Sequence, residues 1–184
     1  MLSQNTSDVN RDRAWASMKG AFPRWSDVLS ARPEALEASI RIGGLAKTKA
    51  PRIQAILREI LEREGRISLS KLNRMSDGEV AEYLGGLPGI GPKTIACVLA
   101  FSSLERPVLP VDTHVYRIGE RLRLYPPKTR EVEAQREYEA LVPPAKRIET
   151  HVSLIAHGRT TCTAQRPACG RCVIADLCPS AAIQ

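Results

Sequence analysis

The sequence lacks any run of apolar residues long enough to cross a membrane, which takes about 20 residues in a helix. It shows no basic segment followed by an apolar one at its start, the pattern of a secretory signal. It also lacks convincing alternation of apolar and polar residues, which is typical of a half-buried strand. These absences exclude membrane-spanning and predominantly β proteins. We therefore predict an all-α protein that is cytoplasmic and nucleoid-associated, with no membrane partner.

Acidic residues are missing from two stretches of the chain, one between Glu37 and Glu59 and the other between Glu149 and Asp176, although both contain several basic residues. The whole chain has 27 lysines and arginines against 20 acids, a net charge of +7. An excess of this sign favours a polyanionic partner such as nucleic acid, although many basic proteins bind none. The stretches would form a phosphate-binding track if they share one side of the fold; otherwise they are solvated surface.

The chain is organised around residues 87–101, LPGIGPKTIACVLAF. Gly89 and Gly91 predict a turn with positive φ or close backbone approach, and Pro92 suits the first position of the helix that follows. A glycine turn before a helix N-terminus presents free N–H groups that can bind a phosphate. The stretch lacks the GKS or GKT sequence and the preceding strand of a nucleotide-binding loop. It is therefore interpreted as a hairpin between two helices that binds a nucleic-acid backbone.

Lys93 is the only charged residue between Glu82 and Glu105, and this isolation makes it a candidate reactive amine. Asp112 follows the extended segment 107–111 and precedes a predicted helix, so the returning chain can bring both residues to one opening. An amine attacks C1′ of a sugar only when it is neutral, a form that apolar surroundings and a helix N-terminus favour. Asp112 could accept a proton or stabilise a cationic sugar. Alternatively, Lys93 only contacts a phosphate and Asp112 only caps a helix.

Caps, prolines and apolar spacing predict helices along the rest of the chain. The first follows the cap residues Thr6 to Asp8 and turns Trp15, Met18 and Phe22 toward the core. The other predicted helices span residues 33–40, 53–64, 76–84, 113–122, 129–141 and 148–156. From Arg159 onward we expect a cysteine-bearing loop.

Four of the five cysteines lie in this terminal loop with the spacing C-x6-C-x2-C-x5-C, namely Cys162, Cys169, Cys172 and Cys178. Disulfide bonds are disfavoured in a chain without a secretion signal. Structural zinc usually joins two close cysteine pairs, and only Cys169 and Cys172 form such a pair here. Four thiolates in a compact loop favour a [4Fe–4S] cluster, with zinc as the alternative. Cys97, in the hairpin helix, is interpreted as a small buried apolar side chain.

Three signals, LPGIGPKT at the hairpin, VDTH at residues 111–114 and the terminal cysteine motif, together resemble the endonuclease III family. Its members are helix-hairpin-helix DNA glycosylases and AP lyases with a [4Fe–4S] cluster. The resemblance covers residues 2–179 and implies a six-helix barrel domain at 1–106, with the hairpin at about 84–101, and a cluster domain at 107–184. It also implies that double-stranded DNA with a damaged base or an abasic site binds in a cleft between the domains. We expect the protein to be a monomer.

The resemblance implies roles for single residues. Lys93 resembles the Schiff-base nucleophile and Asp112 the catalytic carboxylate, and the match favours iron–sulfur over zinc for the four cysteines. Gln4 resembles a residue that fills the gap left by a flipped nucleotide, and Leu45 one that wedges into the opposite strand. The implied DNA contacts are Gln4, Leu45, Gly89, Gly91, His114 and Arg166.

The implied activity is removal of oxidised pyrimidines, followed by β-elimination that cuts the strand 3′ to the abasic site through a lysine Schiff base.

The family has a helix before the LSQ motif that this sequence does not contain, so we expect either a longer natural chain or a less supported cluster domain. Pro92 stands where the family often has an arginine, which removes one phosphate contact. The alternatives are a monofunctional mismatch glycosylase of the same fold, which generally lacks a lysine at the position of Lys93, and a non-catalytic DNA-binding module.

Overall fold

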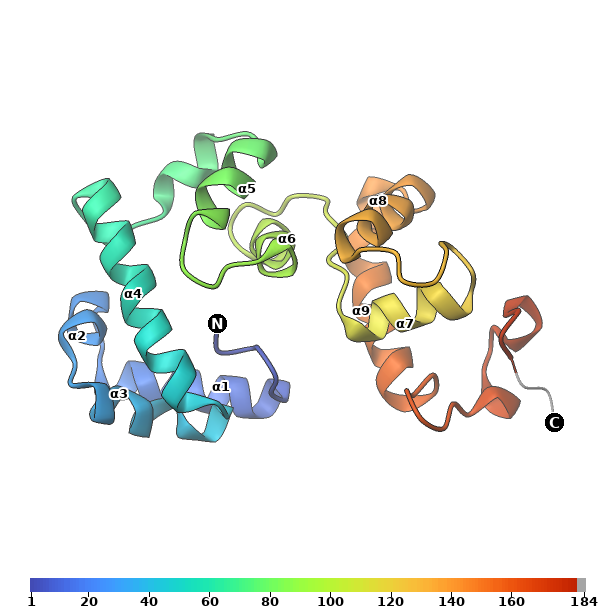
Figure 1. Ribbon diagram of the computed structural model, residues 1–184, viewed down its shortest axis with the longest axis horizontal. Coiled ribbons are helices and arrows are strands. Elements are labelled where there is room, and N and C mark those ends of the chain that lie inside the picture. The colour runs from blue at the N-terminus through green and yellow to red at the C-terminus, as the bar shows by residue number, and fades with distance from the viewer. Residues whose placement is uncertain (182–184) are drawn as a thin grey trace. The chain divides into compact units, whose positions relative to one another are not determined.

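The computed structural model describes residues 1–181, which form helices and turns and contain no strand (Figure 1). The all-α prediction is therefore confirmed. The α-helices are α1 (Asp8–Ala21), α2 (Trp25–Ser30), α3 (Pro33–Ile40), α4 (Ala46–Glu64), α5 (Asp77–Gly85), α6 (Pro92–Phe101), α7 (Thr113–Arg121), α8 (Glu131–Leu141) and α9 (Arg147–Thr160). Within this part of the chain, no helix is both long enough and apolar enough to span a membrane.

The chain packs as two compact units. The first comprises Met1–Met75 and Glu82–Ile90, and the second comprises Ser76–Ala81 and the chain from Gly91 onward. The division runs through α5 and through the hairpin turn, and each unit has its own hydrophobic core. The domain boundary that we predict at 106/107 stays a prediction.

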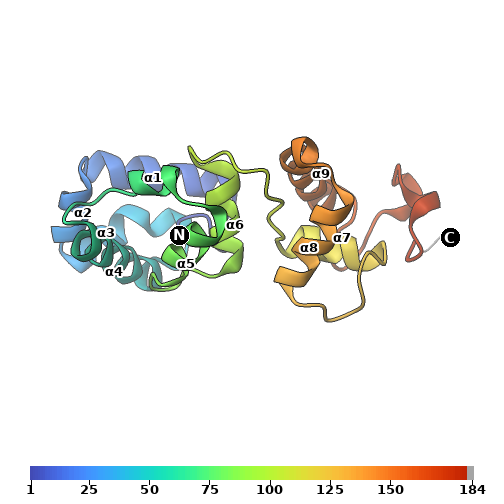
Figure 2. The same ribbon diagram turned by 90° about the horizontal axis from the view of Figure 1, so that it is seen from above.

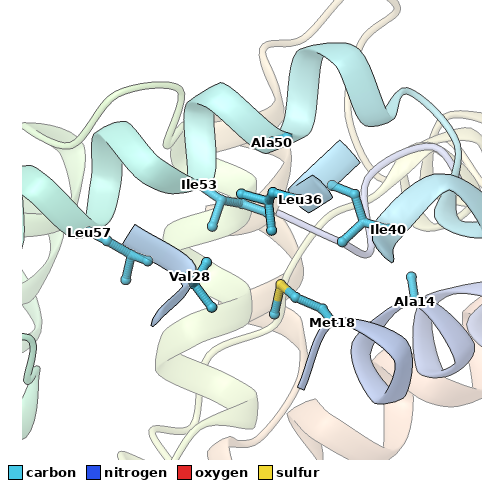
Figure 3. Packing of buried hydrophobic residues seen from close by; sticks show 8 residues of the cluster. All are labelled: Ala14, Met18, Val28, Leu36, Ile40, Ala50, Ile53 and Leu57. Atoms are coloured by element: carbon cyan, nitrogen blue, oxygen red, sulfur yellow. The ribbon is translucent and has the colours of Figure 1, made fainter. Parts of the chain in front are cut away.

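The core of the first unit forms between α4 and the three helices that precede it. α4 presents Ile53, Leu57 and Ile60 at helical spacing, and all three are buried. Figure 3 shows the packed side chains, which come from α1, α2, α3 and α4: Ala14, Met18, Val28, Leu36, Ile40, Ala50, Ile53 and Leu57. The short 3-10 turn η1 (Arg41–Gly43) packs against α1. This packing fixes the loop that leads into α4.

The start of α1 agrees with the prediction, but one of its aromatic residues does not. Ser7 caps the helix, with its Oγ accepting a hydrogen bond from the Asn10 N–H at 3.2 Å. Met18 is buried, whereas Trp15 is 46% exposed, so its predicted place in the core is wrong. The buried face of α1 passes through Ala14 and Met18, one helical turn apart, and Trp15 lies to one side of it. Trp15 instead contacts Trp25, with ring centroids 5.8 Å apart.

α2 is a helix that the sequence analysis does not predict. It has 6 residues, which is too short to show a helical repeat of apolar positions. Its start is held by Arg24, whose backbone N–H donates to the Asp27 carboxylate at 3.0 Å. Arg24 and Asp27 also form an ion pair at 3.0 Å. Arginine is not a typical capping residue, which is why this signal is invisible in the sequence.

α7, α8 and α9 of the second unit form its core with the extended segment before α7. Figure 2 shows these three helices grouped together. Val111 and Val115 are buried against Tyr125 and Tyr138, whose hydroxyls donate to backbone carbonyls. Burial raises the pKa of both tyrosines. A Cβ added at Gly119 would lie 2.5 Å from the Tyr125 hydroxyl, so only glycine allows the tyrosines to pack this closely.

A capping box holds the start of α5, which follows the Ser76-x-x-Glu79 pattern of the sequence. The backbone N–H of Ser76 donates to Glu79 Oε2 at 2.7 Å, and that of Glu79 donates to Ser76 Oγ at 3.4 Å. The extended segment that follows α6 is also as predicted, and its residues Val108 to Val111 are buried. Both features follow from local chemistry, since capping and proline act within a few residues of the chain.

Candidate active site and cysteine loop

The two glycines of the hairpin turn differ in backbone conformation and in what surrounds them. Gly89 has φ 71°, a conformation that favours glycine, and a Cβ there would lie 2.5 Å from the Arg52 side chain, which would have to shift. Gly91 is extended, with φ −106° and ψ 175°, and nothing lies within 4 Å of an added Cβ. The expected positive φ is present at Gly89 and absent at Gly91, and a close backbone approach at Gly91 stays a prediction.

Arg52 lies in the first of the two acid-free stretches, and the sequence alone indicates no individual role for it. Its side chain lies against the turn at Gly89 in the same unit and is half-buried. This contact brings a guanidinium group from α4 to the hairpin turn. A guanidinium at a glycine turn suits a phosphate. No local pattern in the sequence could reveal this pairing, because it depends on how α4 packs.

Lys93 and Asp112 both lie at the N-termini of helices of the second unit. Lys93 is the second residue of α6 and is exposed, and no described residue forms a hydrogen bond or ion pair with its Nζ. Asp112 caps α7 and is half-buried, with Oδ1 accepting from the N–H groups of His114 and Val115 at 2.8 Å each. Within residues 1–181, Oδ2 of Asp112 has no hydrogen-bond partner. The carboxylate is thus oriented through one oxygen and leaves the other available.

The charges of Lys93 and Asp112 act on the same two neighbouring groups. Burial raises the pKa of the Cys97 thiol, with Lys93 lowering it and Asp112 raising it. Burial lowers the pKa of the His151 imidazole, while the Pro110 carbonyl and Asp112 raise it and Lys93 lowers it further. Lys93 and Asp112 therefore share one region of the second unit, as the sequence analysis expects. A half-buried thiol with a raised pKa is poorly reactive, which agrees with a packing role for Cys97.

His151 is a residue of this region that the sequence analysis missed. It lies on α9, is 5% exposed, and has its Nδ1 2.6 Å from the Pro110 carbonyl oxygen. Its ring centroid is 5.3 Å from that of Phe101. The imidazole thus joins α6 and α9 to the segment that delivers Asp112. In the sequence, His151 is a single histidine inside a predicted helix, and its partner, the Pro110 carbonyl, is far away along the chain.

The four loop cysteines line one cavity, together with residues of α7 and α9. In the part of the chain that the structure describes, no three His, Cys, Asp or Glu side chains converge on one metal position. A zinc ion needs four ligands at about 2.0–2.3 Å from a single centre, whereas a [4Fe–4S] cluster spreads its four cysteines over four corners. Four half-buried thiols around one cavity, without convergence on one point, fit the cluster.

Two arginines of α7 hold the cysteine loop. Arg121 donates to Cys162 Sγ at 3.1 Å and to the Thr163 carbonyl at 2.8 Å. Arg117 donates to the carbonyl of Cys162 at 2.8 Å and lies 3.1 Å from His114 Nδ1. Hydrogen bonds to ligand sulfurs orient a cluster and tune its potential. These arginines were also missed, because the sequence does not show which face of α7 meets the loop.

The remaining predicted DNA contacts are distributed over both units. In the first unit, Gln4 is half-buried in the turn before α1, and Leu45 is 55% exposed at the start of α4. In the second unit, His114 is half-buried against α9, since a Cβ at Gly158 would lie 2.8 Å from its Cβ. Arg166 is exposed on the cysteine loop. The DNA-binding roles of these residues stay predictions.

A helical hairpin leading to a free lysine, in a chain that ends in a four-cysteine loop, is the architecture of a base excision DNA repair protein. Residues 1–144 match the model of the HhH-GPD superfamily base excision DNA repair proteins. Residues 162–178 match the iron-sulfur binding domain of endonuclease III. The chain belongs to the HhH-GPD superfamily and carries this iron–sulfur domain.

Individual relatives agree with this assignment. Endonuclease III of Escherichia coli is 33% identical over 97% of this chain and 79% of the relative. A candidate DNA glycosylase of Arabidopsis thaliana is 38% identical over 86% of this chain, which spans 54% of that relative's length. Among solved structures, a non-covalent endonuclease III–DNA complex matches with a TM-score of 0.82 and 27% identity, over 98% of this chain and 79% of that chain. A thermostable thymine-DNA glycosylase, at 18% identity and a TM-score of 0.76, shares the fold.

These matches confirm the predicted family, the endonuclease III fold and the [4Fe–4S] cofactor. They also decide the metal question against zinc. The roles of the four cysteines as its ligands stay a prediction. The predicted enzyme class, a DNA N-glycosylase, is that of the family.

The cluster assignment predicts a sharp difference between two cysteine substitutions. Cys169→Ser should lose most of the bound iron and the visible absorbance of the purified protein, because a cluster corner loses its thiolate. Cys97→Ser should keep both, since Cys97 lies in α6 outside the loop. Iron and sulfide analysis of the two variants beside the unchanged protein measures this. Full iron content in Cys169→Ser would contradict its role as a ligand.

Proposed function

We propose that this protein is a bifunctional DNA glycosylase and AP lyase that acts as a monomer on oxidised pyrimidines in duplex DNA. The observation that carries the proposal is the free amine of Lys93 in the same region as the oriented carboxylate of Asp112. Because its substrate is DNA, the proposed location of the enzyme is the cytoplasm, in association with the nucleoid.

The chemistry assigns one role to each of these two residues. Lys93 Nζ attacks C1′ of the flipped nucleotide, and the damaged base leaves with the electrons of the glycosidic bond and takes up a proton. Nζ loses its protons as the sugar ring opens and the C1′–N bond becomes an imine. Removal of a proton from C2′ then expels the 3′ phosphate and cuts the strand. Asp112 stabilises the positive charge on the sugar and accepts a proton through its free oxygen.

Binding of DNA uses a wider set of residues. The hairpin turn at Gly89 and Gly91, with Arg52 beside it, suits one phosphate of the backbone. The other proposed contacts are Gln4 and Leu45 in the opened duplex, and His114 and Arg166 in the second unit. Solved relatives include an endonuclease III–DNA covalent intermediate in an estranged-adenine complex, which supports this kind of duplex opening. When bound, the [4Fe–4S] cluster organises the loop held by Cys162, Cys169, Cys172 and Cys178.

The test is a duplex oligonucleotide that holds one oxidised thymine, incubated with the protein and analysed on a denaturing gel. We expect strand cleavage without alkali, with a product cut 3′ to the lesion. A band that appears only after alkali would indicate the monofunctional alternative. A G·T-mispaired duplex and an undamaged duplex serve as controls. Binding without any base release would indicate the non-catalytic module and contradict the proposal.

A further inference from the structure

Lys49, near the start of α4, is buried although it is a lysine, with 3% of the residue exposed. Its Nζ donates to the carbonyl oxygen of Gly43 at 2.8 Å and to that of Leu2 at 3.1 Å. No carboxylate of the described residues lies within 4.0 Å of this Nζ. Burial lowers the pKa of the amine. A buried cation that only carbonyl groups compensate is costly, so its position needs an explanation.

The two carbonyl groups belong to segments that are far apart in the sequence but adjacent in the first unit. Leu2 lies just before Gln4, and Gly43 lies just before Leu45. The segments run close together, because a Cβ on Gly44 would lie 3.8 Å from the Asn5 carbonyl oxygen. Lys49 therefore joins the turn that carries Gln4 to the turn that carries Leu45.

Both turns contain a residue in the left-handed region. Asn5 has φ 50° and Leu45 has φ 53°. Leucine rarely adopts this conformation, and it persists only where the surrounding structure enforces it. The backbone of Lys49 contributes as well, since its N–H donates to the Leu45 carbonyl at 2.9 Å. The exposed Leu45 side chain thus lies on a strained turn to which Lys49 contributes through both its backbone N–H and its side chain.

We propose that Lys49 is a positioning residue that holds Gln4 and Leu45 at a fixed spacing, so that both enter an opened duplex together. The inference rests on the proposed function, in which these two side chains occupy the space left by a flipped nucleotide. Lys49 takes no part in the chemistry, because its Nζ is buried and donates to two backbone carbonyls.

The experiment follows duplex opening and does not depend on strand cleavage. Lys93→Ala protein is added to a duplex that holds an abasic-site analogue opposite 2-aminopurine, whose fluorescence rises when it loses its stacking. With Lys49 intact we expect a clear rise. Lys49→Met, in the same background, should reduce the rise at saturating protein about fivefold or more. An equal rise in both proteins, or no rise with Lys49 intact, would overturn the proposal, whether or not the protein has lyase activity.

Two controls separate positioning from charge and from folding. Lys47 is exposed at the same end of α4, so Lys47→Met removes the same charge without removing a buried contact. Its affinity for undamaged duplex shows how much of any loss in Lys49→Met comes from charge alone. Thermal unfolding shows whether Lys49→Met remains folded. Should it not fold, a double-mutant cycle with Gln4→Ala and Leu45→Ala replaces it, with Lys49 left in place. Coupled effects on the fluorescence rise support the proposal, and strictly additive effects contradict it.

Discussion

Lys93→Ala will form no covalent adduct when the protein and a duplex with one abasic site are reduced with borohydride. Borohydride reduces the imine between Nζ and C1′ to a stable amine, so a band of slower mobility reports the Schiff base. Alanine has no nucleophile, and we expect trapping and strand cleavage to fall at least about a thousandfold, as is typical when a nucleophile is removed. Lys93→Arg is the matched control, because it keeps the charge but cannot act as a free amine.

The same substitution should leave the fold intact or stabilise it. Lys93 is exposed at the N-terminus of α6, where a positive charge opposes the helix dipole, and alanine is the best helix former. We expect the free energy of unfolding to be unchanged or to rise by about 0.3–1 kcal/mol. Loss of activity at equal or higher stability is typical of a functional residue. An adduct that persists in Lys93→Ala, or a large loss of stability, would contradict the assignment.

Asp112→Asn should slow base release about a hundredfold to ten-thousandfold while the protein keeps its thermal stability. Asparagine caps a helix about as well as aspartate, so its side-chain oxygen can still accept from the N–H groups of His114 and Val115. The substitution therefore removes the negative charge and the proton acceptor without removing the cap. Release of an oxidised base from duplex DNA, measured under single-turnover conditions, gives the rate.

Two further measurements distinguish the charge of Asp112 from its structural role. Asp112→Ala loses the cap and should cost about 1 kcal/mol of stability, which Asp112→Asn does not. The charge of Asp112 raises the pKa of His151, so in Asp112→Asn that pKa should move further below its ordinary value. Titration of the His151 ring protons by NMR measures this shift. A normal rate of base release in Asp112→Asn would leave Asp112 as a cap alone.

The sequence by itself determined the features that depend on neighbours along the chain. The cap at Asp112, the capping box of Ser76 and Glu79, and the turn at Gly89 follow from side chains that reach only a few residues. The cysteine spacing likewise favoured an iron–sulfur loop over a zinc site, and the family resemblance strengthened that choice. Helices with a long apolar repeat, such as α4, were also predictable, because burial of one face imposes the repeat.

Only the tertiary structure decided which distant residues support these features. Arg52 reaches the hairpin turn, His151 holds the segment before Asp112, and Lys49 joins the turns of Gln4 and Leu45. Each is an ordinary polar residue of a helix in the sequence, and each acquires its role from a partner that packing supplies. Trp15 is the converse case, an aromatic residue at core spacing that the rotation of α1 leaves exposed. The physical reason is common to all four, since a helix repeat defines a face but not what that face will meet.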